Sequence, residues 1–544
     1  MTDHTNQETS FPLKFLVMPI LTGTIISLIN IQWMQLFHLL NAPQADSLVY
    51  MTESFKDYWS IRSGDISGLF KKYFLDGDQQ TSPLLWWLAA LAYFLLGLDP
   101  LNAYLVIALI YLIWIAGVMY LAWCIYPDSK YSLACGLMAA FLPSVASHAL
   151  RSFMLDFVAA APFIWATAFL VKSDLGFKRR EVVIYSILSG ITVLFRTTLI
   201  PYFISHLFIV LFLAILHKRH PHYGNMLLSA LVITLVCGGF IFPNMTGIFN
   251  YYGFWATQSP ATGVPPSFFY NLGFYLNLID WFHLKSFALK ALMTISFIAV
   301  VRLVYMYKRK IIKPKQLRTI FNGLIILIPL ALVPIAILSL YSSHAATVDY
   351  PFVAVYLMAP TLLWRTIADK TKIFWIGAGI VILTLAVTQM NYLFKSQYKE
   401  FSVVDYRERE VIKMILDDAQ YSGKKDIIIG NTAIHQHNYL SYQYWIAGNY
   451  FPRWRGHVHG INLGRTNSAT KLAKMNANAD YVIIAENYKA KYPPNNVVAP
   501  EANIILQNLY GMVYMPLSFD IPGRVKIRIL RNHKSFDGIP AGVD

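Results

Sequence analysis

Asp46 follows the first long hydrophobic run, at the start of a polar segment that extends from Asn41 to Leu98. A carboxylate in such a place could accept the proton of an attacking hydroxyl in a group-transfer reaction, for example glycosyl transfer, in which the leaving group departs from the opposite face. One well-placed aspartate is enough for an inverting displacement, so Asp46 is the first candidate for a general base. Aspartate is also favoured at helix N-caps, here of a helix over Ser47–Phe55. The local sequence leaves both roles open.

Arginines that could hold a phosphate occur further along the chain. Arg151 and Asp156 lie at the junction of two hydrophobic runs, where ionisable groups are costly unless they are paired or functional. Arg151 could bind a phosphate through two parallel hydrogen bonds, or it could pair with Asp156 and close the turn. Arg196 has no acidic neighbour in the sequence. It could bind a substrate phosphate, or its side chain could reach lipid phosphates at the interface.

Four further residues are weaker candidates for substrate binding. Lys71 and Lys72 could add cations for the same phosphate, although a lysine pair on an amphipathic helix usually faces lipid headgroups. His344 and Asp349 lie in a later connection and could complete an acidic or metal-binding rim.

The sequence identifies no cofactor motif. His435-x-His437 and His457-x-His459 would each project to one face of an extended chain, but further metal ligands are not evident and surface histidines are the expected case. The three cysteines all lie in apolar runs and show no zinc-site spacing. A glycine-rich nucleotide motif is also absent. No metal ligand is therefore assigned, and a divalent metal stays an open alternative.

Composition places the chain among membrane proteins. Its 544 residues are 56% hydrophobic and 14% charged, with a mean hydropathy of +0.46. Soluble proteins carry about 25% charged residues. Repeated apolar runs of membrane length predict a polytopic helical membrane protein. The net charge of +16 is accordingly interpreted as a topology signal rather than as a sign of a nucleic-acid partner.

The apolar runs predict about eleven transmembrane helices, with Leu84–Leu96 as an additional interfacial or re-entrant helix. The predicted spans are Phe15–Leu36, Leu101–Trp123, Tyr131–Ser147, Phe153–Val171, Val182–Leu194, Ile200–Leu216, Met226–Phe242, Phe287–Tyr307, Ile320–Tyr341, Phe352–Trp364 and Ile373–Tyr392.

Lysine and arginine are unevenly distributed among the connections. The connections Phe242–His283 and Ser342–Tyr350 contain neither residue, whereas the alternate connections are rich in both. Because cytoplasmic loops carry the excess of cations, the N-terminus is predicted to be cytoplasmic in a cytoplasmic (inner) membrane. The Asp46 loop, the junctions at Arg151 and Arg196, and everything after Tyr392 then lie on the outer face.

The chain is predicted to have two domains. Residues 1–393 form a transmembrane module, in which residues 38–100 are the first outer loop. Residues 394–544 have the composition of a soluble domain, which the topology places outside the cytoplasm. Within it, Lys425–Gly430 and Ala479–Ala485 are predicted strands, Asn467–Asn476 a helix, and Gly523–Leu530 an edge or half-buried strand. Strands alternating with helices indicate a small α/β domain.

Short motifs in the first two hundred residues resemble the GT-C superfamily of membrane glycosyltransferases. The resemblance is to the family 39 and 83 type, which includes protein O-mannosyltransferases and the aminoarabinose transferase that modifies lipid A. An Asp-Glu pair followed at short distance by Tyr is typical of the family's first outer loop. Asp46 and Tyr50 match this motif, and Ser47 replaces the Glu. Pro83-Leu84-Leu85-Trp86-Trp87 matches the next element, with Ser82 where the aminoarabinose transferases have Lys.

The later motifs are similar to the family in order and in predicted side of the membrane. Arg151 and Asp156 match an Arg and an Asp a few residues apart, and Arg196 precedes the Leu-x-Pro element Leu199-Ile200-Pro201. A C-terminal extracytoplasmic domain is also common in the family.

The resemblance implies a transferase of the cell envelope. Its donor would be a polyprenyl-phosphate-linked sugar, and its acceptor a hydroxyl of a lipid, a glycan or a protein. Asp46 would be the catalytic residue, with Tyr50, Arg151, Asp156 and Arg196 among the substrate-binding ones.

Two other classes of protein are kept as alternatives. A secondary transporter would favour inverted repeats, broken helices and charges at mid-membrane, whereas here the charges gather at the ends of the spans. A non-catalytic protein that binds or assembles lipid-linked glycans would use Asp46 only as a helix cap.

Overall fold

A computed structural model of the whole chain provides the structure. It describes residues 11–40, 45–77, 79–257, 267–312, 314–340, 348–368, 371–394, 408–431, 452–454, 457–460, 468–486, 495–521 and 525–536. The chain divides into two compact units. The first comprises Met1–Ile31, Ser60–Leu88 and Tyr104–Ser396, and the second comprises Gln32–Trp59, Ala89–Ala103 and Gln397–Asp544.

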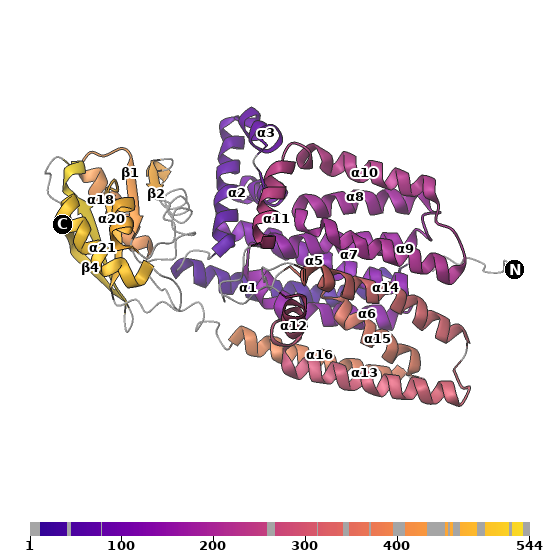
Figure 1. Cartoon of the computed structure of the whole chain (residues 1–544). Helices are drawn as coiled ribbons and strands as arrows, with labels where there is room; N and C mark the ends of the chain where they lie inside the picture. The colour runs from indigo at the N-terminus through magenta and orange to yellow at the C-terminus, as the bar shows by residue number, and fades with distance from the viewer. Residues whose placement is uncertain are drawn as a thin grey trace. The chain divides into compact units, whose positions relative to one another are not determined.

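The first unit is built from long apolar helices, which run side by side in Figure 1. In the described part of the chain, eight helices are long and apolar enough to cross a membrane, and a bent helix pair raises the number to nine. The eight lie in α1 (Val17–Leu40), α5 (Pro100–Ile125), α7 (Leu155–Lys172), α9 (Ile204–His217), α10 (Tyr223–Ile241), α13 (Lys285–Lys308), α14 (Pro314–Leu338) and α16 (Thr371–Phe394). The chain is therefore a polytopic helical membrane protein.

Two of the eleven predicted spans form helices that are too short for this length criterion. They are α8 (Arg179–Phe195), with 17 residues, and α15 (Val355–Ile367), with 13. At 1.5 Å per residue, 13 residues extend about 20 Å, whereas the hydrocarbon core is about 30 Å thick. In the described residues, the length criterion thus counts eight or nine candidate spans, while a helix occupies each of the eleven predicted positions. The short apolar helix predicted at Leu84–Leu96 is present as α4.

The bent pair is the third predicted span. It starts with α6 (Ser129–Ala140) and continues after a bend of 46° through the π-helical turn η2 (Ser144–His148) and the 3-10 turn η3 (Ala149–Arg151). Pro143 precedes η2 and lacks the amide N–H that a continuous helix would use. The break therefore places Arg151 at the end of a distorted segment, and π-helical turns of this kind are frequent at functional sites.

Shorter helices occupy the connections. The first connection holds α2 (Ala45–Ser63), α3 (Ile66–Phe74) and α4, and a later one holds α11 (Met245–Thr257) and α12 (Phe268–Leu278). Asn244 fixes the end of α3, because its side-chain amide donates to Tyr73 O (2.8 Å) and its Oδ1 accepts from Gln79 N (2.9 Å).

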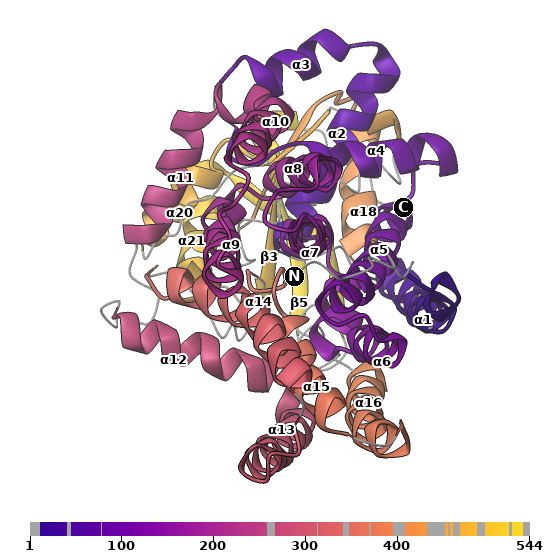
Figure 2. The ribbon, with the colours of Figure 1, turned by 90° about the vertical axis from the view of Figure 1, so that its right-hand side faces the viewer.

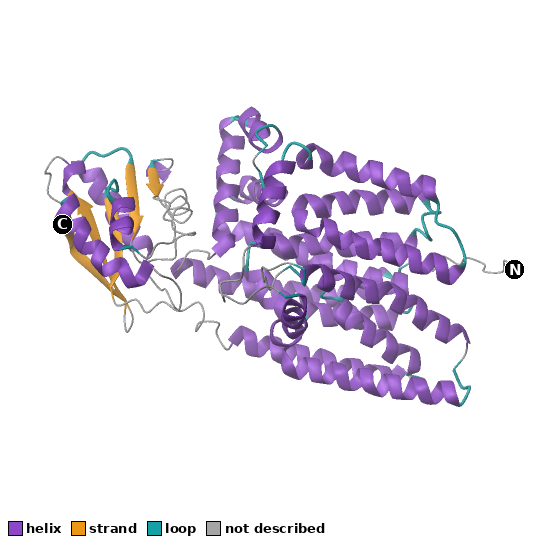
Figure 3. Cartoon of the chain, viewed as in Figure 1, coloured by secondary structure: helices purple, strands orange, loops and turns teal. Residues whose placement is uncertain are grey.

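The strands of the described chain all lie after residue 426, and Figure 3 shows them gathered near the C-terminus. They form one sheet with the order β2-β1-β3-β5-β4. Its strands are β1 (Ile427–Asn431), β2 (Val458–Gly460), β3 (Tyr481–Glu486), β4 (Met512–Ile521) and β5 (Val525–Asn532). Strand β1 pairs in parallel with β2 and with β3, whereas β5 pairs antiparallel with β3 on one side and with β4 on the other. The β4–β5 register shifts between Tyr514 and Ser518. With helices α18 (Glu408–Tyr421), α20 (Ala469–Asn476) and α21 (Asn495–Tyr510), this is the predicted α/β domain.

One detail of that prediction is wrong. The segment Gly523–Leu530 was expected at an edge or half-buried, but β5 lies inside the sheet, and β2 and β4 form the edges. Ile529 and Leu530 are both fully buried. The alternation of polar and apolar residues in this segment therefore does not mark an edge.

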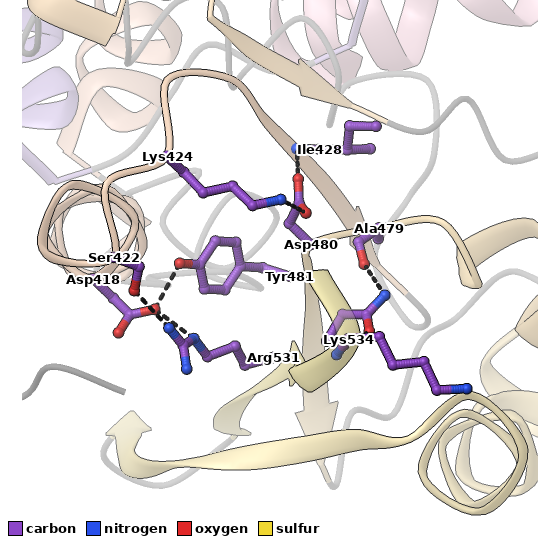
Figure 4. A network of polar contacts seen from close by, with 10 residues as sticks. Asp418, Ser422, Lys424, Ile428, Ala479, Asp480, Tyr481, Arg531 and Lys534 are labelled. Atoms are coloured by element: carbon purple, nitrogen blue, oxygen red, sulfur yellow. Dashed lines mark hydrogen bonds and ion pairs between the residues drawn. The ribbon is translucent and has the colours of Figure 1, made fainter. Parts of the chain in front are cut away.

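A buried polar network joins α18 to the sheet (Figure 4). Asp418 Oδ2 accepts a hydrogen bond from Tyr481 OH (2.6 Å) and lies 2.9 Å from Arg531 Nε. Arg531 also donates to Ser422 Oγ (2.6 Å). Burial raises the pKa of the Tyr481 hydroxyl, and the hydrogen bond and charge of Asp418 raise it further. Tyr481 therefore stays protonated and serves the network as a donor.

Candidate functional site

The ion pair between Asp156 and Arg196 is the centre of a polar cluster in the first unit. Arg196 Nε lies 2.9 Å from Asp156 Oδ1, and the two side chains are only 11% and 5% exposed. Asp156 lies in the first turn of α7, and Arg196 follows the last residue of α8. Carboxylates are favoured at helix N-termini and cations at C-termini. The α7–α8 hairpin therefore places the two charges together, although they are forty residues apart.

Arg151 is held by a side chain of the first helix. Its Nε donates to Asn30 Oδ1 (2.7 Å), and the Asn30 amide in turn donates to Ala146 O and Ile26 O, each at 2.8 Å. Asn30 is almost completely buried in α1. This amide therefore fixes both the arginine and the distorted turn that carries it.

Asp349 belongs to a buried chain of hydrogen bonds rather than to a solvent-exposed rim. Its Oδ2 lies 2.6 Å from His283 Nε2, and Ser144 Oγ lies 2.7 Å from His283 Nδ1. All three residues are at most 2% exposed. Because a carboxylate can only accept, His283 Nε2 carries the proton that bonds Asp349, and in the neutral ring Nδ1 accepts from the Ser144 hydroxyl. His283 thereby ties η2 to the turn that precedes α15.

Tyr202 is near both this chain of hydrogen bonds and the ion pair. Its hydroxyl donates to Val348 O (3.2 Å), next to Asp349. The charges of Asp156, Arg196 and Asp349 all act on this hydroxyl. The structure thus gathers three of the predicted site residues around a tyrosine that the sequence analysis did not select.

Helix α2 carries the remaining motif residues, Asp46 and Tyr50. The helix begins at Ala45, so Asp46 lies in its first turn, and the Asp46 side chain lies outside the described residues. Asp46 and Tyr50 are four residues apart and so share one face of the helix. Both belong to the second unit. Within that unit Ser54 Oγ lies 3.1 Å from Tyr93 OH of α4, and the Phe55 ring stacks on the Tyr93 ring.

The other predicted residues are placed as follows. Lys72 lies on α3, donates to Tyr73 OH (2.7 Å) and approaches the Tyr73 ring, whereas the neighbouring Lys71 is exposed. His344 lies outside the described residues. The structure therefore brings together Asp156, Arg196 and Asp349, while the meeting of Asp46 with the arginines stays a prediction.

Metal ligands are not gathered anywhere in the part of the chain that the structure describes, where no three His, Cys, Asp or Glu residues are placed to hold an ion. His457 Nδ1 lies 2.8 Å from Asp426 Oδ1, and His459 Nε2 lies 3.9 Å from the same atom. Both histidines are about half exposed. The His435-x-His437 pair lies outside the described residues.

Asn30, Tyr202 and His283 are the cluster residues that sequence reasoning missed. Asn30 is one of three side-chain amides inside the first apolar run, with Gln32 and Gln35, and His283 ends a connection without lysine or arginine. An isolated polar residue in a membrane segment is costly unless it has a partner. That cost could have marked Asn30 and His283 as site residues, but the sequence does not show which residues they contact.

Comparison with known proteins shows the fold. Neither a family model nor a curated protein sequence matches the chain. The crystal structure of ArnT from Cupriavidus metallidurans in the apo state matches 99% of this chain and 100% of its own, with 13% identity and a TM-score of 0.56. The structure of ArnT from Cupriavidus metallidurans bound to undecaprenyl phosphate matches 98% and 99%, with 13% identity and a TM-score of 0.54. The predicted GT-C resemblance is thereby confirmed at the level of the fold.

Proposed function

We propose, from the fold that this chain shares with ArnT, that it transfers a sugar from a polyprenyl-phosphate donor to a hydroxyl of a lipid, glycan or protein. The observation that supports this most is the match over 98% of the chain to a protein with undecaprenyl phosphate bound. The partly buried arginines near helix ends supply the chemistry that a lipid phosphate needs, because one guanidinium group can donate two parallel hydrogen bonds to phosphate oxygens.

The proposed reaction is a single inverting displacement. The acceptor hydroxyl attacks the anomeric carbon and gives its proton to the Asp46 carboxylate, while the bond from that carbon to the phosphate oxygen breaks. The polyprenyl phosphate leaves with the bonding electron pair, and Arg151 and Arg196 stabilise its charge. One preoriented donor of this kind typically contributes about 3 kcal/mol to transition-state stabilisation. Asp156 orients Arg196 through their ion pair.

Release of polyprenyl phosphate by the purified protein is the test. Polyprenyl-phosphate sugars would be offered with lipid, glycan and protein acceptors, and the products followed by mass spectrometry. We expect one donor class to be consumed, with equal amounts of polyprenyl phosphate and glycosylated acceptor. A transporter would move the donor between leaflets intact, and a binding or assembly protein would retain it unchanged. Either result with every donor would contradict the proposal.

The charge distribution also predicts sidedness, with the N-terminus in the cytoplasm and residues 394–544 in the periplasm or outside the cell. Reporter fusions after Lys178, within Gly253–Tyr270 and after Asp544 would measure it. We expect a cytoplasmic signal from the first fusion only. A cytoplasmic signal from either of the others would overturn the topology and would place the Arg196 cluster on the wrong face for this donor.

Arg151→Ala and Arg196→Ala should each weaken binding of undecaprenyl phosphate. Hydrogen bonds to charged groups are worth about 1.5 to 3 kcal/mol, so we expect a loss of about 10- to 150-fold per variant. The measurement is a titration of the detergent-solubilised protein with the lipid. Arg219→Ala is the matched control, because it breaks an exposed arginine–aspartate pair with Asp174.

A structural role for Arg196 predicts a different pattern. Arg196→Ala leaves Asp156 buried without its ion-pair partner, and Asp156→Asn in the same chain removes that charge. If the double variant binds the lipid as tightly as the parent, Arg196 only neutralises Asp156. If binding stays weak while thermal stability recovers, the phosphate contact is supported.

A further inference from the structure

Helices α9 and α14 enclose an apolar groove in the first unit, and Figures 1 and 2 show the two helices side by side. Its volume is about 300 Å³, at the lower end of the range for small-molecule sites. The lining is entirely apolar: Phe212, Ile215 and Leu216 from α9, and Leu324, Ile325, Ile328 and Pro329 from α14.

The groove faces the surroundings of the bundle rather than its interior. Ile215 is 65% exposed and Ile328 is 48% exposed. Both residues lie in candidate membrane spans, so the medium that contacts them is hydrocarbon. Pro329 lies inside α14 and cannot donate to Ile325 O. Pro329 is one of the residues that line the groove, and the apolar lining suits a hydrocarbon chain better than water.

Cations from both helices lie at one end of the groove. Helix α9 ends at His217, and the next residue is Lys218, which is exposed and held in a left-handed conformation (φ 52°). Arg318 is exposed in the second turn of α14. From the rise per residue, Lys218 lies about 3 to 9 Å beyond the α9 lining and Arg318 about 9 to 16 Å beyond the α14 lining.

The loop that carries Lys218 has a fixed backbone. His222 N donates to Leu175 O (3.0 Å), and Asn225 Nδ2 donates to Gly176 O (2.7 Å), so the α9–α10 loop is tied to the α7–α8 loop. Arg219 is already engaged by Asp174 (3.2 Å) and stacks on the Phe177 ring. Asp174 is therefore occupied by Arg219 rather than by the adjacent Lys218.

We propose that this groove binds one anionic phospholipid, with an acyl chain between α9 and α14 and the phosphate beside Lys218 and Arg318. A hydrocarbon-facing groove with a cationic end matches both parts of such a lipid. Anionic headgroups gain about 1 kcal/mol from each nearby lysine or arginine.

The proposed lipid is separate from the proposed sugar donor. Arg196 lies before the 3-10 turn η4 (Thr197–Phe203), and Lys218 follows α9, which continues from that turn. The two elements together extend about 35 Å, roughly the thickness of the hydrocarbon core. A phosphate beside Lys218 therefore belongs to the opposite leaflet from a phosphate beside Arg196.

Native mass spectrometry of the full-length protein, titrated with phosphatidylglycerol or phosphatidylcholine, tests the proposal. We expect one phosphatidylglycerol to bind in preference to phosphatidylcholine. Lys218→Gln with Arg318→Gln should weaken this binding by about 30-fold. Ile325→Trp fills the groove and should abolish the bound lipid while both cations remain. Arg179→Gln with Arg180→Gln is the matched control, since it removes the same charge from α8, which does not line the groove.

Three results would overturn the proposal. Equal losses in the Lys218/Arg318 and Arg179/Arg180 variants would show only general attraction to an anionic surface. Displacement of the lipid, one for one, by undecaprenyl phosphate would assign the groove to the donor chain. Full competition by inorganic phosphate would show that the apolar groove adds nothing to the affinity for the lipid. Monodispersity and thermal stability of each variant, compared with the parent, separate loss of the site from loss of the fold.

Discussion

Asp46→Asn should slow sugar transfer by about 100- to 10,000-fold and leave donor binding unchanged. Loss of a general base typically costs this much, because the acceptor proton then has no receiver in the transition state. Asparagine has the same size and can still accept a hydrogen bond. A residue that only stabilises the first turn of α2 would lose about 1 kcal/mol or less of stability and little rate. The measurement is single-turnover transfer at saturating donor, with variant and parent compared at equal donor occupancy.

Asp65→Asn is the matched control for Asp46→Asn. Asp65 lies in the same connection and caps α3 by accepting from Gly68 N (3.0 Å). The same change of charge in the same loop should leave the rate within a few-fold of the parent. If Asp46→Asn also stays within a few-fold, the base is another carboxylate. Asp156 and Asp349 would then be the next residues to change.

Asp418→Ala should destabilise the C-terminal domain by about 3 to 5 kcal/mol. Asp418 is fully buried, and Arg531, which pairs with it, is only 4% exposed. Removing one member of a buried pair leaves the other charge without compensation in a region of low dielectric. Pulse proteolysis of the full-length protein in urea, followed by detection of the C-terminal fragment, measures this loss.

Two further variants make this result specific. Asp417→Ala changes the adjacent residue, which is 57% exposed and pairs with Lys413 four residues earlier. Such exposed helix pairs are worth about 0.3 to 0.5 kcal/mol, so stability should hardly change. Asp418→Leu with Arg531→Met and Tyr481→Phe replaces the pair and the hydroxyl bonded to it by apolar groups and should recover most of the loss. If Asp418→Ala costs no more than Asp417→Ala, the buried network does not hold α18 on the sheet.

The sequence predicted the positions of the helices better than their lengths. Each of the eleven apolar runs became a helix because a segment in hydrocarbon must satisfy its own backbone polar groups, which a helix does. The helices α8 and α15, with 17 and 13 residues, are nevertheless shorter than the 18 residues of the span criterion. In the soluble domain, periodicity located β1, β3 and β5. It did not order them, because strand order depends on pairing between segments far apart in the chain.

The candidate site could be predicted only as separate residues. Arg151, Asp156 and Arg196 were selected because charged groups at membrane boundaries are costly, and this cost is visible in the sequence. Their partners depend on the packing of α1, α7 and α8, which no local pattern encodes. Arg151 could thus be expected to pair with Asp156, whereas the structure shows its bond to Asn30 and the pairing of Asp156 with Arg196.

The irregular edge of the C-terminal sheet affects whether copies of this protein can join through their sheets when they are crowded in one membrane. Proteins confined to a bilayer meet edge to edge at high local density, and a flat sheet edge would recruit a second chain as an extra strand. Strand β4 forms one edge, with its register shift between Tyr514 and Ser518 and with Pro516, which has no amide N–H to offer. This edge is therefore a poor template for another strand, and crowding should not polymerise the domain through it.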